Sequence, residues 1–288
     1  MKVDILAEAK WLKDYWQPRN TQIQEDRDIV NLVKETPTLD KLNWISNEPK
    51  VFYDTAIALV SGYPPRFRLP LTVNAELEEK NRMNKAERFL LGIWRQLDRR
   101  QMDRGMSYWL RELAYWTLSG WYANFNIVDI REGETVFIAD HWDPMTVYPE
   151  WDSDGLRKCI RSFEVDKQTA LAMVDDWRAK GLQTEFKEPS RRGDVEIINY
   201  WRKASQGGKN VVSNAIYVAG KEVKPLTVEK RLKRIPIPVG AVGIPERGSS
   251  EWQARWGEHC IATNRDMYAY TNALIKLLAT ILSETAYP

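Results

Sequence analysis

Few side chains in this sequence are suited to catalysis or metal binding. The chain has two histidines, His141 and His259, and two cysteines, Cys159 and Cys260. His141 and Asp143 could form an acid–base or metal-binding pair, but two side chains are too few for a zinc site. His259 and Cys260 are adjacent, and adjacent side chains on a helix diverge by about 100°. A thiol–imidazole dyad would therefore need other partners, and the simpler interpretation gives both histidines structural roles.

A short acidic segment is the remaining candidate for a cation site. Asp152, Asp154 and Gly155 resemble the opening of a calcium loop, which also requires a glutamate at its twelfth position. Glu164 falls one position beyond that place when Asp152 is counted as the first, so a solvated hairpin turn is the simpler interpretation. The motifs G-x-x-x-x-G-K-[ST] and G-x-G-x-x-G do not occur. We therefore predict that the protein is not an enzyme and uses no metal or cofactor.

The composition excludes several classes of protein. The 288 residues include 42 Lys and Arg against 40 Asp and Glu, a net charge of +2, which excludes a strongly basic protein that coats DNA. Two cysteines cannot form a disulfide framework, so we expect a reducing cytoplasm as the place of synthesis. We find neither a signal-peptide run nor about 18 consecutive uncharged apolar residues, and we expect no membrane span. Thirteen tryptophans favour extended contact surfaces.

The first 124 residues have mainly helical periodicity, and Gly62-Tyr63-Pro64-Pro65 interrupts it before an extended stretch at 66–73. Pro18 should stop the first helix, and Asn74 is a candidate N-cap with acidic residues after it. We predict helices over about 5–16, 22–35, 49–61, 74–100 and 103–124.

At Phe125 the apolar period changes from that of a helix to that of a strand. Turn residues separate the strands, and the segment 166–180 is the one helix among them, ending at Gly181. The fold class that we predict is therefore α+β, with a hairpin-rich module and an inserted helix. We expect strands over 126–131, 135–140, 145–150, 156–164, 183–187, 194–202, 214–218 and 222–226.

The last part of the chain predicts one long helix over 249–284, capped by Ser249 or Ser250. Apolar residues recur along it at alternating spacings of four and three, as in a coiled-coil seam. A buried core helix of one domain is the alternative to packing against helices of other copies. The residues that we predict at a subunit interface are Trp256, Met267, Tyr270, Leu274, Leu277 and Ile281. Arg255, Arg265 and Lys276 recur at spacings of 10 and 11 residues, which keeps them on one side of the helix.

Five motifs follow one another in a distinctive order. They are YPP at 63–65, AYWTLSG at 114–120, HWDPMTVYPEWD at 141–152, IPIPV at 235–239, and GSSEW at 248–252 before a helix that contains Asn264. In this order, over most of the chain, they resemble the portal protein, or head–tail connector, of tailed bacteriophages.

The resemblance implies a structural role in the virion. Portal proteins form a ring, commonly of twelve subunits, at one capsid vertex, where the ring nucleates head assembly with the major capsid protein. The ring docks the terminase, passes double-stranded DNA during packaging and ejection, and later binds head–tail adaptor proteins. By analogy, 1–124 would be the mainly helical part of the wing, 125–245 its β-rich part, and 249–284 the first stem helix. We expect no clip, second stem helix or crown within these residues.

Basic clusters support a rival hypothesis. Arg99, Arg100 and Arg104 form one cluster, and the segment 230–234 contains Lys230, Arg231, Lys233 and Arg234. As a nucleic-acid-binding module the chain would need both clusters on one face. Solvated surface or salt links between subunits are the simpler interpretation of such runs. For the portal hypothesis, Arg255, Arg265 and Lys276 are the side chains that we expect to face the DNA channel.

Overall fold

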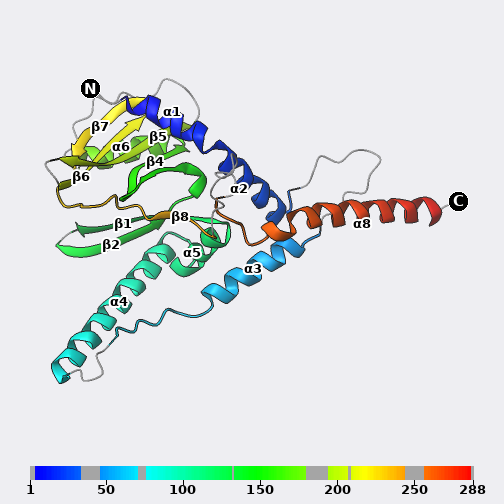
Figure 1. The fold of residues 1–288 in the computed structure, drawn as a ribbon, viewed down its shortest axis with the longest axis horizontal. Coiled ribbons are helices and arrows are strands. Elements are labelled where there is room, and N and C mark those ends of the chain that lie inside the picture. Colours follow the sequence, from blue (N-terminus) through cyan, green and yellow to red (C-terminus); the bar gives the residue numbers. More distant parts are fainter. Residues whose placement is uncertain are drawn as a thin grey trace.

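The computed structural model of this chain describes residues 4–33, 46–70, 76–131, 133–179, 194–206, 209–243 and 256–286. Helices and two antiparallel sheets make up these residues, so the protein belongs to the α+β class as predicted. Figure 1 shows the two sheets in one body, from which α4 and α8 extend in different directions. None of the helices in the described part of the chain is long and apolar enough to cross a bilayer.

Two consecutive helices begin the chain. Asp4 caps α1 (Ile5–Tyr15) by accepting a hydrogen bond from the Ala7 amide at 3.1 Å. The next helix, α2 (Gln17–Val30), begins five residues earlier than predicted and ends before the predicted Glu35. Pro18 lies in the first turn of α2, where its missing N–H costs no hydrogen bond. Only Trp16 therefore separates the two helices.

In the described residues, three more helices follow before the first strand. The predicted helix at 49–61 is confirmed as α3 (Glu48–Ser61). Asn74 lies outside the described residues, and Glu76 occupies the N-cap position of α4 (Leu77–Asp103). The helix predicted over 103–124 is wrong at both ends, because α5 spans only Trp109–Leu118. Gly120 has a φ of +97°, which ends the helical path, and a strand starts at the next residue.

The smaller sheet has the order β2–β1–β8. The predicted first hairpin is confirmed as β1 (Trp121–Arg131) and β2 (Glu134–His141). The other edge of β1 pairs with β8 (Val239–Ala241), and the carbonyls of Pro236 and Pro238 accept hydrogen bonds from the Asn126 and Asn124 amides. The isoleucine–proline connector therefore extends the pairing along β1, and α4 packs beside β2.

The larger sheet has the order β3–β4–β5–β6–β7, and every neighbouring pair is antiparallel. The second predicted hairpin is confirmed as β3 and β4 of this sheet, and the predicted inserted helix is confirmed as α6 (Lys167–Ala179). The strand predicted at 183–187 lies outside the described residues. α6 covers one face through Ala170 and Val174, and α1 covers the other through Ala9 and Leu12. Its strands are β3 (Val147–Asp152), β4 (Gly155–Val165), β5 (Val195–Gln206), β6 (Lys209–Val218) and β7 (Lys221–Val228).

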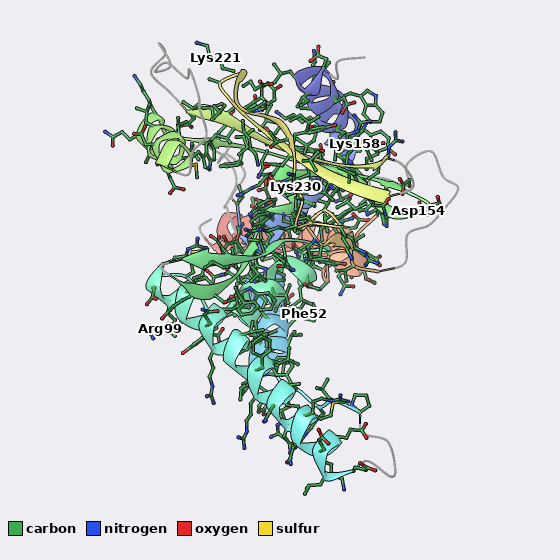
Figure 2. All side chains as sticks on the ribbon, turned by 90° about the vertical axis from the view of Figure 1, so that its left-hand side faces the viewer. Phe52, Arg99, Asp154, Lys158, Lys221 and Lys230 are labelled. Atoms are coloured by element: carbon green, nitrogen blue, oxygen red, sulfur yellow. The ribbon has the colours of Figure 1, made fainter. Side chains whose placement is uncertain are left out.

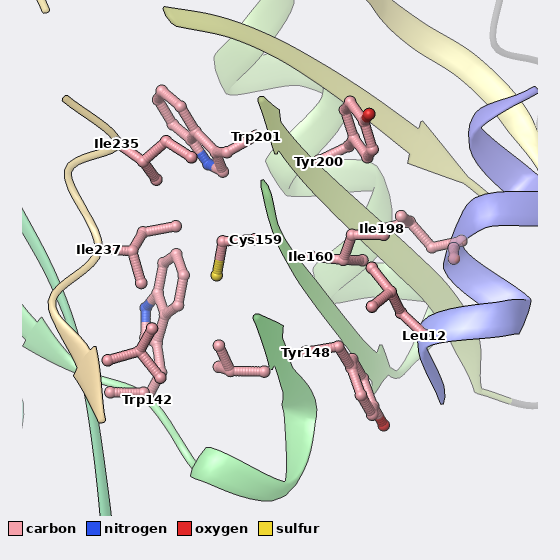
Figure 3. Close-up of a cluster of buried hydrophobic side chains, with 14 of the residues drawn as sticks. Leu12, Trp142, Tyr148, Cys159, Ile160, Ile198, Tyr200, Trp201, Ile235 and Ile237 are labelled. Atoms are coloured by element: carbon pink, nitrogen blue, oxygen red, sulfur yellow. The ribbon is translucent and has the colours of Figure 1, made fainter. Parts of the chain in front are cut away.

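The main core joins the two sheets. Figure 3 shows Ile235 and Ile237 of the connector pointing toward Trp201, Trp142 and Cys159. The alternating prolines keep the connector extended, so every second residue points inward. The connector therefore contributes apolar side chains to the core as well as hydrogen bonds to β1.

The predicted long helix is shorter than its periodicity suggests. Residues 256–261 are not helical, a 3-10 turn covers Ala262–Asn264 (η2), and the helix α8 spans Arg265–Ala286. Gly257 has a φ of +96° and lies against Trp121 and the Gly120 carbonyl. This close contact fixes a bend that a helix cannot contain. Residues 249–255 lie outside the described residues.

Candidate functional site

The outward face of α8 is apolar and exposed. At about 100° per residue, seven large apolar side chains fall within an arc of about 140°, and each has between 46% and 70% of its surface exposed. We call this face the α8 arc. It consists of Met267, Tyr270, Leu274, Leu277, Leu278, Ile281 and Leu282. An arc this wide is typical of a helix face that packs against a core, yet none of the described residues covers it.

The opposite face of α8 holds the helix to its own chain. Arg265 in the first turn donates two hydrogen bonds to the carboxylate of Asp26 in α2, at 2.6 and 2.8 Å. Tyr268 packs against a cluster that includes Tyr53 and Ile57 of α3. One turn further on, the Asn272 side-chain oxygen accepts a hydrogen bond from the Ser46 amide at 2.9 Å. The base of α8 is thus anchored, and Figure 1 shows the rest of the helix extending away from the sheets.

The structure brings five of the six predicted interface residues together. Met267, Tyr270, Leu274, Leu277 and Ile281 all belong to the α8 arc. Trp256 does not, because it precedes the helix and packs inside its own chain. Its ring lies 4.9 Å from Trp151 and 5.7 Å from Trp121 between centroids, and its carbonyl accepts a hydrogen bond from the Trp121 indole. Sequence periodicity alone did not single out Leu278 and Leu282, which widen the arc on one side.

The three predicted channel-facing cations have different environments. Arg255 lies outside the described residues. The Arg265 guanidinium forms an ion pair with Asp26, whose side chain is only 4% exposed. Lys276 is partly exposed and lies within about 20° of Arg265 around the helix axis, so these two do share one side as predicted. That side is opposite the α8 arc.

The two predicted basic clusters lie apart. Arg100 and Arg104 both contact Asp140 of β2, at 3.3 and 2.8 Å, so the first cluster is partly neutralised. The second cluster follows β7 and is exposed at Arg231, Lys233 and Arg234. Figure 2 shows Arg99 on α4, below the β1–β2 sheet in this view, and Lys230 above that sheet. The rival hypothesis of one nucleic-acid-binding face that combines both clusters stays a prediction.

His141 and Asp143 are not brought together, whereas His259 Nδ1 lies 3.8 Å from the Cys260 sulfur. The ring nitrogens of His141 lie 2.6 Å from the Asn124 side-chain oxygen and 3.0 Å from the Trp109 carbonyl oxygen, while Asp143 pairs with Arg27. His259 Nδ1 accepts a hydrogen bond from the Ile261 amide at 3.2 Å, and burial lowers its pKa to about 4. Burial also raises the pKa of Cys260 to about 11.

The candidate calcium segment forms a hairpin turn. The Asp152 carboxylate accepts a hydrogen bond from the Asp154 amide at 2.9 Å, and Lys203 lies 3.7 Å from the same carboxylate. Gly155 adopts the positive φ of +104° that this turn requires. Across the described residues, no three His, Cys, Asp or Glu side chains are grouped so that they could share a metal ion.

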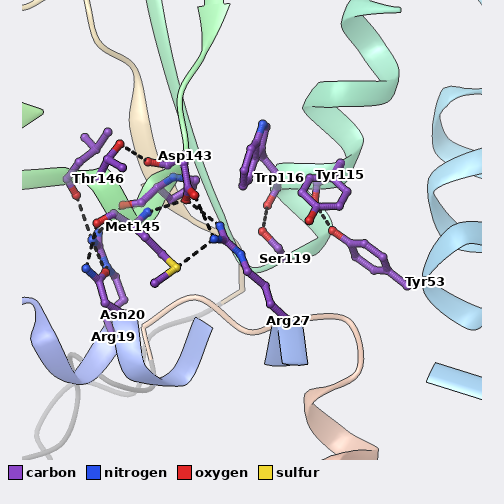
Figure 4. A network of polar contacts seen from close by, with 12 residues as sticks. Arg19, Asn20, Arg27, Tyr53, Tyr115, Trp116, Ser119, Asp143, Met145 and Thr146 are labelled. Atoms are coloured by element: carbon purple, nitrogen blue, oxygen red, sulfur yellow. Dashed lines mark hydrogen bonds and ion pairs between the residues drawn. The ribbon is translucent and has the colours of Figure 1, made fainter. Parts of the chain in front are cut away.

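Sequence reasoning missed a polar network that joins α2 to the turn after β2. Figure 4 shows Arg19, Asn20 and Arg27 reaching this turn, which includes η1 (Pro144–Thr146). Arg27 donates to both carboxylate oxygens of Asp143, at 2.6 and 2.9 Å. Asn20 donates to the Met145 carbonyl at 2.9 Å. The spacing of Arg19, Ile23 and Arg27 by four residues places them on one face of the helix, which is the signal that could have indicated this contact.

Arg19 is the most buried member of that network. Its guanidinium donates to the carbonyls of Pro144 and Val147 at 2.9 Å each, and it lies 4.8 Å from the ring centroids of both Trp16 and Trp121. Burial lowers its pKa to about 9, so it still carries its charge at neutral pH. The aromatic rings and carbonyls that surround this cation give it a structural role.

Comparison with models of known protein families gave no match, and no curated protein matched the sequence. The geometry of the exposed surfaces therefore carries the functional argument.

Proposed function

We propose that this chain is a portal protein of a tailed bacteriophage, in which the α8 arc packs against neighbouring copies around a ring. The exposed α8 arc is the observation that carries the proposal. Within the described residues, seven large apolar side chains are exposed on a helix whose anchoring contacts with Asp26 and Ser46 lie on the opposite face. The motifs at 141–152 and 235–239, which resemble those of the portal family, provide the second support.

A ring needs contacts that repeat by rotation. In such a ring each copy uses two different surfaces, one toward each neighbour. The α8 arc is wide enough to contact helices on two sides, because Leu278 and Leu282 lie toward one edge and Tyr270 and Leu277 toward the other. Burying large apolar side chains of this kind contributes about 1.5–3 kcal/mol for each one that is fully removed from water.

The charge pattern suits passage of DNA rather than its capture. Each phosphate that a protein neutralises adds salt-dependent affinity, which would hinder movement through a channel. Between Met267 and Leu282 the only charged residue is Lys276. We propose Lys276 as the α8 side chain that faces the channel. In the virion, the ring would serve at the head–tail junction, nucleate head assembly and dock the terminase and later the adaptors, as the resemblance implies.

The proposal is tested by charged substitutions in the α8 arc. We expect the wild-type chain to sediment as a large oligomer and the variant Tyr270→Lys/Leu274→Lys to sediment as a monomer with unchanged circular dichroism. The matched control is Phe52→Lys/Leu59→Lys, since these residues of α3 are 51% and 75% exposed but lie outside the arc. A wild-type monomer at micromolar concentration, or an α8 variant that assembles like the control, would overturn the proposal.

A further inference from the structure

α4 has a continuous basic face, of which the sequence clusters indicated only Arg99. Lys85, Arg88, Arg95 and Arg99 are all exposed, and at about 100° per residue they fall within about 80° of one another. The stripe is about 21 Å long at 1.5 Å per residue. Figure 2 shows Arg99 near the sheets and side chains tipped with nitrogen along the length of α4. We call these four residues the α4 basic stripe.

The acidic residues of α4 do not neutralise this stripe. Among the described residues, none of its four side chains forms an ion pair. Glu87 instead accepts a hydrogen bond from the Leu69 amide at 2.9 Å. Asp98 accepts one from the Trp109 amide at 2.9 Å. Both acids lie about 100–120° around the helix from the centre of the stripe. Glu78 and Asp103 lie on the same side as the stripe but beyond its two ends, so no acid lies between its four positive charges.

The stripe has no apolar anchor of the kind that a protein partner would need. Gly92 lies at its centre and is exposed. Between 81 and 99, the only large apolar side chain exposed on α4 is Phe89, which turns aside to pack its ring 5.8 Å from that of Phe137. Protein interfaces take most of their affinity from buried aromatic and apolar anchors. Charges without such anchors instead suit a polyanion, whose binding is driven by release of counterions.

Further cations lie beside one end of the stripe. The extended segment after α3 passes along α4, and together they enclose an open hollow of about 410 Å³, whose charged lining residues are Arg66, Arg68, Arg88 and Glu87. Arg66 and Arg68 are both exposed, and the nearest carboxylate oxygen of Glu87 lies 3.8 Å from Arg68. Planar guanidinium groups bind phosphate oxygens in a bidentate manner. The cationic surface therefore continues from the helix onto this segment.

We propose that the α4 basic stripe, with Arg66 and Arg68, binds the phosphate backbone of double-stranded DNA without sequence preference. Single-stranded nucleic acid is disfavoured because its binding sites use several exposed aromatic rings on which bases stack. The one such ring on this stretch of α4, Phe89, packs against Phe137. This contact is separate from any DNA channel along α8, since α4 and α8 extend from the body in different directions (Figure 1). It does not depend on ring formation.

The test measures binding of a fluorescent 30-base-pair duplex by anisotropy between 50 and 200 mM salt. Six neutralised phosphates, one for each residue of the stripe and for Arg66 and Arg68, predict a slope of log affinity against log salt of about −5.4. We expect Arg88→Glu/Arg95→Glu to weaken binding at least about tenfold at the lowest salt and to reduce the slope by about 2. The matched control, Arg231→Glu/Arg234→Glu, changes two exposed arginines away from α4 and should leave the affinity within about twofold.

Three outcomes would overturn the inference. The first is that the wild-type chain does not bind the duplex at 50 mM salt. The second is that the two charge-reversed pairs weaken duplex binding equally. The third is that a single strand of the same length binds as tightly as the duplex. Circular dichroism confirms the fold of each variant. Sedimentation of the same variants separates this site from assembly, because we expect Arg88→Glu/Arg95→Glu to leave the oligomer unchanged.

Discussion

Arg265, in the first turn of α8, donates two hydrogen bonds of 2.6 and 2.8 Å to the buried carboxylate of Asp26 in α2. The two residues are separated by 239 positions in the sequence, so the pair ties the last helix to the N-terminal helices. The hydrogen bonds to Asp26 raise the pKa of the Arg265 guanidinium above its ordinary value. This contact sets the direction in which α8 leaves the body and turns its apolar arc outward.

Removing the arginine should destabilise the fold strongly. The Asp26 side chain is only 4% exposed, and a buried charge that loses its partner costs about 3–5 kcal/mol. We expect Arg265→Ala to lower the free energy of unfolding by about 3 kcal/mol in urea titrations. The control Arg157→Ala removes an exposed ion pair with Glu150 and should cost less than about 1 kcal/mol. Equal losses in the two variants would show that the pair does not anchor α8.

The bend at Gly257 should tolerate no side chain. A Cβ there would lie 2.5 Å from the Gly120 carbonyl and would also clash with the Trp121 indole, at a φ of +96°. We expect Gly257→Ala to cost at least about 2 kcal/mol in thermal or urea unfolding. Gly92→Ala is the control, because nothing lies within 4 Å of its Cβ, and alanine there should stabilise α4 by up to about 1 kcal/mol. A neutral Gly257→Ala would contradict the described path before α8.

Acid should weaken the fold through His259. Burial holds the pKa of His259 in the folded chain at about 4, whereas the unfolded chain binds a proton below about 6.5. The stabilisation from this group is therefore complete above pH 6.5 and is lost as the pH falls toward 4, by up to about 3 kcal/mol. Nuclear magnetic resonance titration of a His141→Gln variant, which leaves a single histidine, should give a midpoint near 4. A midpoint near 6.5 would contradict the burial.

Both cysteines should resist modification in the native protein. Cys159 is fully buried and burial raises its pKa, and the pKa of Cys260 rises to about 11 for the same reason. Only the thiolate reacts, so at pH 8 the reaction of Cys260 with Ellman's reagent should be about 100-fold slower than that of an ordinary thiol. When guanidinium chloride unfolds the chain, both thiols should react immediately. A fast thiol in the native chain would refute this assignment.

Local sequence patterns were sufficient for most of the β-rich part of the fold. Alternating apolar residues and turn glycines such as Gly133 and Gly155 determine the two hairpins, since these signals act within a few residues. Gly181, which follows the predicted inserted helix, gave a usable stop signal in the sequence. Such elements depend little on distant parts of the chain.

The errors arose where distant residues decide the structure. Trp256, Cys260 and Thr263 continue the seam of α8 in the sequence, yet the contact of Gly257 with Gly120 and Trp121 takes this segment out of the helix. Helical periodicity contains no information about a contact across 136 positions or more. The same limit applies to the site, because the sequence indicated the apolar seam but not Asp26 as the partner of Arg265.

Electron microscopy of the native, negatively stained chain tests the central claim most directly. If the α8 arc is buried between copies around a pore, averaged images should show rotationally symmetric rings with a central opening. Twelve copies of the 33.6 kDa chain would give a particle of about 400 kDa. Images that contain only single compact particles of monomer size, with α8 free in solution, would contradict the account.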